Sequence, residues 1–236
     1  MARTLIILTS HTALGDTGRA TGFYFEEMAT PHWALIDAGH AVDIASIEGG
    51  AAAHDPGSVA ADASERPAAV ARFLGDADAM AKLSDTIPVR AVDPALYDAV
   101  FVPGGHGTMW DMPDDPDLAR ILSAVWAAGG AIGSVCHGPA GLLGARKPDG
   151  SPLVAGLRVN AFTDAEEAAA GLTDVVPFLL ETRLRGQGAR FENASNFAAH
   201  AVRDGRLVTG QNPASVRAVS DLFVRAVAKA TAATAA

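Results

Sequence analysis

Residues 131–140, AIGSVCHGPA, contain the only cysteine of this 236-residue chain. An apolar run leads up to Cys136, and His137, Gly138 and Pro139 follow it directly. The run has the length and composition of a buried strand, and glycine followed by proline fits a tight turn into the first position of a helix. A strand that turns sharply into a helix presents its turn residue above the sheet. This stretch therefore predicts a nucleophile elbow with Cys136 at its tip.

Segments typical of strands alternate with segments typical of helices on both sides of the elbow. Strands are expected at TLIILTS (4–10), AVDIASI (41–47), YDAVFVPGG (97–105), AIGSVC (131–136), LRVNAFT (157–163) and GRLVTG (205–210). Helices are expected over 21–40, 115–130, from 139 to 146, over 164–189 and over 212–233. Continuous apolar strands separated by helices are typical of a mostly parallel sheet covered on both faces. We expect one α/β domain spanning residues 1–236.

Two segments carry more specific expectations. The helix over 21–40 is expected to start at a Thr21 cap and to break or kink at Pro31. Residues 50–90 are rich in Ala, Asp and Pro with a weak helical pattern, so we expect an excursion at the sheet edge. The acidic run 111–117 is expected to be a polar loop and helix cap without a catalytic role.

Composition excludes several classes of function. The formal net charge of -9 argues against nucleic-acid binding, which needs a basic surface. No run of about 18 uncharged apolar residues is present, so we expect no membrane-spanning helix. A single cysteine rules out an intrachain disulfide and suits a reducing cytoplasm.

Two turns are expected at the carboxyl ends of strands, where parallel sheets bind their ligands. They are PGGHGT (103–108) and CHGPA (136–140). A thiol at a helix start lies in a positive field that favours the thiolate, and backbone N–H groups there can hold an oxyanion. The alternative is a buried structural cysteine. From the residues alone we infer an activated thiol site, without a particular reaction.

Five segments resemble one family of proteins. They are TGFYFEEMATPHW (21–33), VPGGHGTMWDMPDD (102–115), AIGSVCHGPAGLL (131–143), NAFTDAEEAA (160–169) and GRLVTGQNPASV (205–216). In this order they resemble the ThiJ/PfpI superfamily, and within it the heat-shock chaperone and glyoxalase III branch. The resemblance implies a flavodoxin-like three-layer sandwich related to class I glutamine amidotransferases.

The resemblance also implies a catalytic set. Cys136 matches the nucleophile and His137 the histidine that follows it. Glu27 matches the acid that hydrogen-bonds the sulfur, and Glu26 is the alternative if the register slips by one. Glu167 matches the acid that orients the histidine.

Glu166 and Asp164 are neighbours of Glu167 and leave open which acid orients the histidine. The remaining matches concern the substrate pocket. Gly105 and the backbone N–H of His137 match the oxyanion hole, and His106 falls in the substrate pocket. No metal site is expected: His32 is a candidate ligand, but no second or third ligand is identifiable.

The function implied by the resemblance is a glutathione-independent glyoxalase. Such an enzyme converts methylglyoxal or glyoxal to lactate or glycolate through a cysteine hemithioacetal, without a cofactor. Glu27 would lower the pKa of the thiol and carry a proton between the two carbons. The resemblance also suggests a homodimer acting on a small reactive carbonyl in the cytoplasm.

Several alternatives remain open. One is a holdase chaperone, and another is a redox sensor. A third is a different cysteine hydrolase or lyase, such as a peptidase, an amidase or an isonitrile-hydratase-like enzyme. A glutamine amidotransferase would need a late His-x-Glu pair, whereas Ala201 and Val202 follow His200, so this class is disfavoured.

Overall fold

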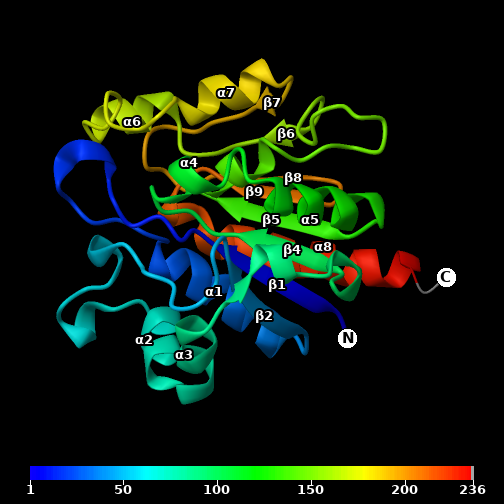
Figure 1. The fold of residues 1–236 in the computed structure, drawn as a ribbon, viewed down its shortest axis with the longest axis horizontal. Helices are drawn as coiled ribbons and strands as arrows, with labels where there is room; N and C mark the ends of the chain where they lie inside the picture. Colours follow the sequence, from blue (N-terminus) through cyan, green and yellow to red (C-terminus); the bar gives the residue numbers. More distant parts are fainter. Residues whose placement is uncertain (235–236) are drawn as a thin grey trace.

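The computed structural model describes residues 1–234, which are arranged around a seven-stranded sheet (Figure 1). Its strands are β1 (Arg3–Leu8), β2 (Ala41–Ser46), β3 (Ile87–Pro88), β4 (Ala99–Val102), β5 (Ala131–Val135), β8 (Ala201–Asp204) and β9 (Leu207–Gly210). The order is β3-β2-β1-β4-β5-β9-β8, and only the β8–β9 pair is antiparallel among these strands. The predicted mostly parallel α/β fold is confirmed.

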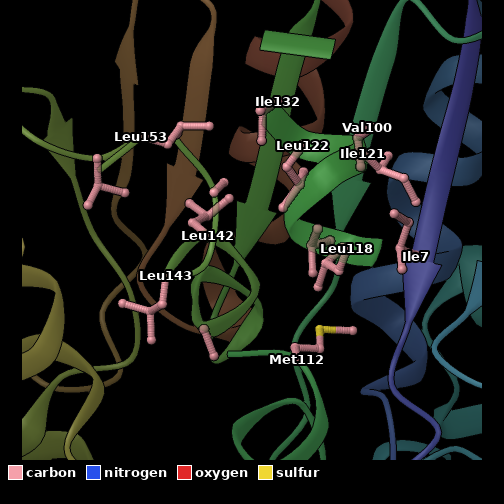
Figure 2. Close-up of a cluster of buried hydrophobic side chains, with 14 of the residues drawn as sticks. Ile7, Val100, Met112, Leu118, Ile121, Leu122, Ile132, Leu142, Leu143 and Leu153 are labelled. Carbon is pink, nitrogen blue, oxygen red and sulfur yellow. The ribbon is translucent and has the colours of Figure 1, made fainter. Parts of the chain in front are cut away.

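Helices cover both faces of the sheet. The α-helices are α1 (Phe25–Asp37), α2 (Ala68–Gly75), α3 (Ala77–Ser84), α4 (Thr108–Asp111), α5 (Pro116–Ala127), α6 (Asp164–Ala169), α7 (Leu180–Gly186) and α8 (Val216–Thr234). Successive strand residues point to opposite faces, so Leu5 and Ile7 of β1 pack in one core cluster and Ile6 and Leu8 in another. The first cluster lies under α5 and is shown in Figure 2; the second lies under α1 and α8. Helix, sheet and helix layers make the predicted three-layer sandwich.

The helix expected over 115–130 leads into the strand that precedes the elbow. The Asp115 carboxylate accepts the N–H of Leu118 at 2.7 Å, and Pro116 occupies the first turn, where its missing N–H costs nothing. The helix ends before Gly129, whose φ of +88° is left-handed. The chain then enters β5 directly, which confirms both predicted elements.

The helix expected over 21–40 differs in detail. It begins at Phe25, and Thr21 instead donates its hydroxyl to Asp55 at 3.0 Å, so the prediction of a Thr21 cap is wrong. Of the break or kink expected at Pro31, the break is wrong, because α1 runs through this residue. A proline costs one intrahelical hydrogen bond, and buried side chains on both sides of Pro31, including Met28 and Leu35, hold the helix together.

Three other expectations were only partly met. The strand expected over 157–163 is reduced to β6 (Arg158–Val159), which pairs with β7 (Arg190–Phe191) in a separate two-stranded sheet. The helix expected from 139 is a 3-10 helix, Gly138–Leu142. The segment 164–189 forms two short helices, α6 and α7, which lie beyond one edge of the main sheet (Figure 1).

The excursion over 50–90 contains α2 and α3, which lie together next to α1 (Figure 1). Phe73 of α2 packs edge-on against Phe25 of α1, with ring centroids 5.7 Å apart. The segment thus thickens the α1 layer and ends in the edge strand β3. No helix in the part of the chain that the structure describes is long and apolar enough to cross a membrane.

Candidate active site

Cys136 lies at the tip of a strained turn that follows β5. Its φ of +60° is left-handed, which a residue with a side chain rarely adopts. Two hydrogen bonds hold it there: its N–H donates to the Gly210 carbonyl at 2.9 Å, and its carbonyl accepts the Phe162 N–H at 2.8 Å. A Cβ on Gly138 would lie 2.2 Å from the Val102 carbonyl oxygen, so only glycine allows the turn to pack this closely on β4. The structure therefore has the geometry of the predicted elbow.

Two imidazoles share one carboxylate beside the thiol. Nδ1 of His137 lies 3.3 Å from Sγ of Cys136, and its Nε2 lies 2.7 Å from Oε2 of Glu167. The other oxygen, Oε1, lies 3.0 Å from Nε2 of His106, which follows β4. Glu167 belongs to α6, whose first turn is fixed by a capping box between Thr163 and Glu166. Three of the predicted residues are thus linked to the thiol in one chain of contacts.

The charges of this group follow from burial and hydrogen bonding. Burial alone would raise the pKa of Glu167, but hydrogen bonds to His106 and His137 outweigh it and lower this pKa to about 2. Burial, followed by the nearby His106, lowers the pKa of His137 to about 4. A carboxylate therefore faces a neutral His137 imidazole at neutral pH. Each imidazole donates its Nε2–H to Glu167, which leaves Nδ1 of His137 free to accept the thiol proton.

Glu27 approaches the thiol from α1 and is fully buried. Its Oε2 accepts the N–H of Gly104 at 2.9 Å, and its Oε1 is buried without a hydrogen-bond partner. The carboxyl lies near enough to the Cys136 thiol for each group to shift the pKa of the other. Burial raises the pKa of Glu27 to about 8, so this carboxyl is neutral at pH 7. Glu26 is only partly buried and faces a surface groove with Thr30 and Arg217. The structure thus selects Glu27 over Glu26.

The thiol itself differs from the sequence-based expectation. Cys136 is 4% exposed, and burial raises its pKa well above the ordinary value. Glu27 raises this pKa further once it ionises. The expectation that the helix start and Glu27 would lower the thiol pKa is wrong, because it left out the cost of placing a charge away from water. The resting site holds a neutral thiol beside a neutral carboxyl.

Two backbone N–H groups form the candidate oxyanion site. Within residues 1–234, the N–H groups of Gly105 and His137 donate to no protein oxygen. Gly105 has a φ of +102°, and a Cβ there would lie 2.2 Å from the Gly22 carbonyl oxygen, so the position requires glycine. A Cβ on the preceding Gly104 would lie 2.7 Å from the His137 nitrogen, so the two turns are in contact. The two predicted donors therefore lie on adjoining turns, and their role as an oxyanion hole stays a prediction.

One group of side chains has the composition of a metal site. The ligand atoms of His106, His137 and Glu167 lie within 4.8 Å of one another. Both imidazoles already donate to the carboxylate, so an ion would have to displace both protons. His32 lies elsewhere: it is buried, with its ring edge-on to Trp33 at 4.8 Å, and burial lowers its pKa to about 4.

Asp111 has a structural role at the rim of the site that was not predicted from the sequence. Asp111 accepts the Thr9 hydroxyl at 2.7 Å and the N–H groups of Ser10 and His11 at 2.7 and 3.0 Å. It thereby fastens the loop after β1 to α4. Asp111 stands in a run of acidic residues with nothing local to distinguish it, so no sequence signal could have found this role.

A cysteine at a strained elbow, an imidazole that can accept its proton and two buried carboxyl groups define a cysteine-dependent enzyme on a flavodoxin-like sheet. The chain belongs to the DJ-1/PfpI family, whose model matches residues 20–226.

Comparisons with individual proteins agree with this membership. The chain is 32% identical to glutathione-independent glyoxalase HSP31 from Saccharomyces cerevisiae, over 92% of this chain and 94% of that protein. The structure of Rapid Encystment Protein 24 kDa from Francisella tularensis has a TM-score of 0.91 and 33% identity, covering 96% of this chain and 99% of that one. Glyoxalase III from Candida albicans has a TM-score of 0.87 and 27% identity, covering 95% and 97%.

Proposed function

We propose that this protein is a glutathione-independent glyoxalase that converts methylglyoxal to lactate and glyoxal to glycolate. The observation that carries the proposal is the line of contacts from Cys136 through His137 to Glu167, with the neutral carboxyl of Glu27 near the thiol. This arrangement supplies a nucleophile, a base and a proton carrier. Two of the similar proteins described above bear the name glyoxalase, which supports the same activity.

The first step adds the thiol to the aldehyde. Sγ of Cys136 forms a bond to the aldehyde carbon while its proton passes to Nδ1 of His137. The carbonyl oxygen becomes an oxyanion, which the N–H groups of Gly105 and His137 receive. His137 then returns the proton to this oxygen, and a hemithioacetal results. Glu167 stays ionised throughout and holds the imidazole in the reactive tautomer.

The second step moves hydrogen between the two carbons. Glu27 donates its proton to the ketone oxygen and takes up the proton that leaves the former aldehyde carbon, giving an enediol. Glu27 then gives this proton to the second carbon and recovers a proton from the hydroxyl on the first carbon, so that the first carbon becomes a thioester, the second an alcohol, and Glu27 is neutral again. The first carbon is oxidised and the second is reduced, so no external oxidant is needed. Water then cleaves the C–S bond, releasing the 2-hydroxy acid and the thiol.

Burial of the site favours small substrates. Cys136 is 4% exposed and His137 1%, whereas the His106 side chain is 20% exposed and lies at the accessible side. The substrate must therefore bring its carbonyl carbon to a nearly enclosed sulfur from the side of His106, which a terminal aldehyde can do. We therefore propose a small reactive carbonyl as the substrate class and His106 as part of its pocket.

The test is formation of D-lactate from methylglyoxal, measured with and without glutathione. We expect turnover without glutathione, and we expect its loss in Cys136→Ala and Cys136→Ser. Serine keeps the shape of the side chain but is a far weaker nucleophile at the elbow, so it separates the chemistry of sulfur from packing. Turnover by a folded Cys136→Ala variant would refute the thiol mechanism. Hydrolysis of an amide or peptide in place of lactate formation would favour the hydrolase alternative.

A further inference from the structure

Besides Cys136, one other non-glycine residue of the described chain has a left-handed backbone. It is Phe197, whose φ is +61°. Such a conformation is unfavourable for a large side chain and persists only where its surroundings impose it. Phe197 lies in the connection between β7 and β8, far from the elbow along the sequence. The contacts that hold Phe197 in this conformation therefore need to be identified.

Phe197 is held by the buried carboxylate of Glu166, which precedes Glu167 in the sequence. The N–H of Phe197 donates to Oε1 of Glu166 at 2.7 Å. The same oxygen accepts the side-chain N–H groups of Gln211 at 3.0 Å and Asn212 at 2.8 Å. Glu166 therefore ties the Phe197 segment to α6 and to the start of the closing helical segment. The backbone of Phe197 is fixed relative to the helix that carries Glu167.

The Phe197 ring extends an aromatic row that begins at the catalytic group. The Phe162 ring lies 4.4 Å from the His137 ring and 6.2 Å from the Phe197 ring, measured between centroids. The backbone of Phe162 is bonded to Cys136, so the row is anchored at the elbow. Phe197 is 52% exposed, which means that its ring contributes little to the core. A strained, exposed aromatic ring at the end of such a row fits contact with a ligand better than folding.

We propose that Phe197 determines substrate specificity: together with Phe162 it forms an apolar wall that receives the substituent on the ketone carbon of a 2-oxoaldehyde. The preferred substrates are then 2-oxoaldehydes with an apolar substituent, aromatic ones above all, over glyoxal, which carries only hydrogen there. This inference rests on the proposed function. The reaction is unchanged: an arylglyoxal and water give a 2-hydroxy-2-aryl acid, the aldehyde carbon being oxidised and the ketone carbon reduced.

The test compares kcat/KM for phenylglyoxal, followed as mandelate, with kcat/KM for glyoxal, followed as glycolate. Phe197→Ala removes the ring and is expected to lower the phenylglyoxal-to-glyoxal ratio about three- to tenfold, the factor that one aromatic contact provides. Phe197→Tyr keeps the ring and should keep the ratio. Leu96→Ala is the matched control, because Leu96 is 53% exposed and precedes β4, at the opposite end of the strand from the site.

The possible results distinguish a failure of this inference from a failure of the proposed function on which it rests. If the wild type converts both substrates and Phe197→Ala leaves the ratio unchanged, the specificity role is overturned and the glyoxalase activity stands. An equal loss with both substrates would assign Phe197 a structural role and would also overturn the inference. A changed molecular mass with an unchanged ratio would place Phe197 in an interface between copies instead. Failure of the wild type to convert either substrate would overturn the proposed function, and the inference with it.

Discussion

Replacing Glu167 tests whether one carboxylate keeps two imidazoles in the reactive tautomer. Glu167 offers one oxygen to His137 at 2.7 Å and the other to His106 at 3.0 Å. Glutamine would offer one oxygen, and its NH₂ group would oppose the N–H of the second imidazole. Leucine would offer no acceptor. The three side chains have similar size, so they form a graded series of two, one and no acceptors.

The expected loss of kcat/KM follows from removing the hydrogen-bond acceptor at Nε2 of His137. Without an acceptor at Nε2, the imidazole can carry its proton on Nδ1, the atom that faces Sγ of Cys136 at 3.3 Å, and it then cannot take the thiol proton. General acid–base catalysis contributes about 10²- to 10⁴-fold to enzymatic rates. We expect Glu167→Leu to lower kcat/KM by about that factor and Glu167→Gln to lie between it and the wild type.

The assay is D-lactate formation from methylglyoxal, with thermal unfolding followed by circular dichroism to show that each variant is folded. Glu192→Gln is the control, because it removes a carboxylate that pairs with Arg158 at the surface. We expect this control to retain wild-type turnover. Two results would refute the reasoning: a folded Glu167→Leu within threefold of the wild type, or a folded Glu167→Gln no more active than Glu167→Leu.

Three further predictions concern the pH dependence of turnover, the pH dependence of stability, and assembly. Burial raises the pKa of Glu27 to about 8, so wild-type turnover should decline as pH rises through about 8 and this proton carrier ionises. Glu27→Gln should lose this decline together with most of its activity. A wild-type pH profile without the decline would contradict the role of Glu27 as proton carrier. Because the folded chain keeps this proton between the ordinary value of 4.5 and about 8 while the unfolded chain releases it, the free energy of unfolding should fall across that interval in the wild type and less in Glu27→Gln, as urea titrations would show. The family resemblance predicts a homodimer, so light scattering should give about twice the 24.1 kDa of one chain.

The elbow and the helix before it could be predicted because their signals are local. Cys136 and the residues that make its turn are adjacent in the sequence, and α5 is marked by a cap, a proline and a closing glycine. The strand expected over 157–163 failed because its backbone is bonded to distant parts of the chain: Asn160 donates to the Thr209 hydroxyl and Phe162 to Cys136. No local pattern contains these partners.

The sequence could decide one of the two choices between adjacent glutamates and could not decide the other. Thr163 and Glu166 have the spacing of a capping box, which places the Glu166 carboxylate back on the start of the helix, so sequence could have separated Glu166 from Glu167. Nothing comparable distinguishes Glu26 from Glu27. Which of these two faces inward depends on how α1 is rotated against the sheet and α8, and packing alone decides that.

Three buried carboxyl groups in and beside this site show that burial does not set their charge by itself. Glu27 accepts one backbone N–H, and its other oxygen is buried without a partner, so desolvation prevails and keeps it protonated up to about pH 8. Glu167 binds two imidazoles, which lower its pKa to about 2. Glu166 accepts bonds from Thr163, Phe197, Gln211 and Asn212, and its pKa is also lowered. A proton carrier must be neutral and an orienting group must be charged at the same pH, and the number and kind of donors around each carboxyl make both possible in one site. An added N–H donor beside Glu27 would therefore impair catalysis without removing any catalytic residue.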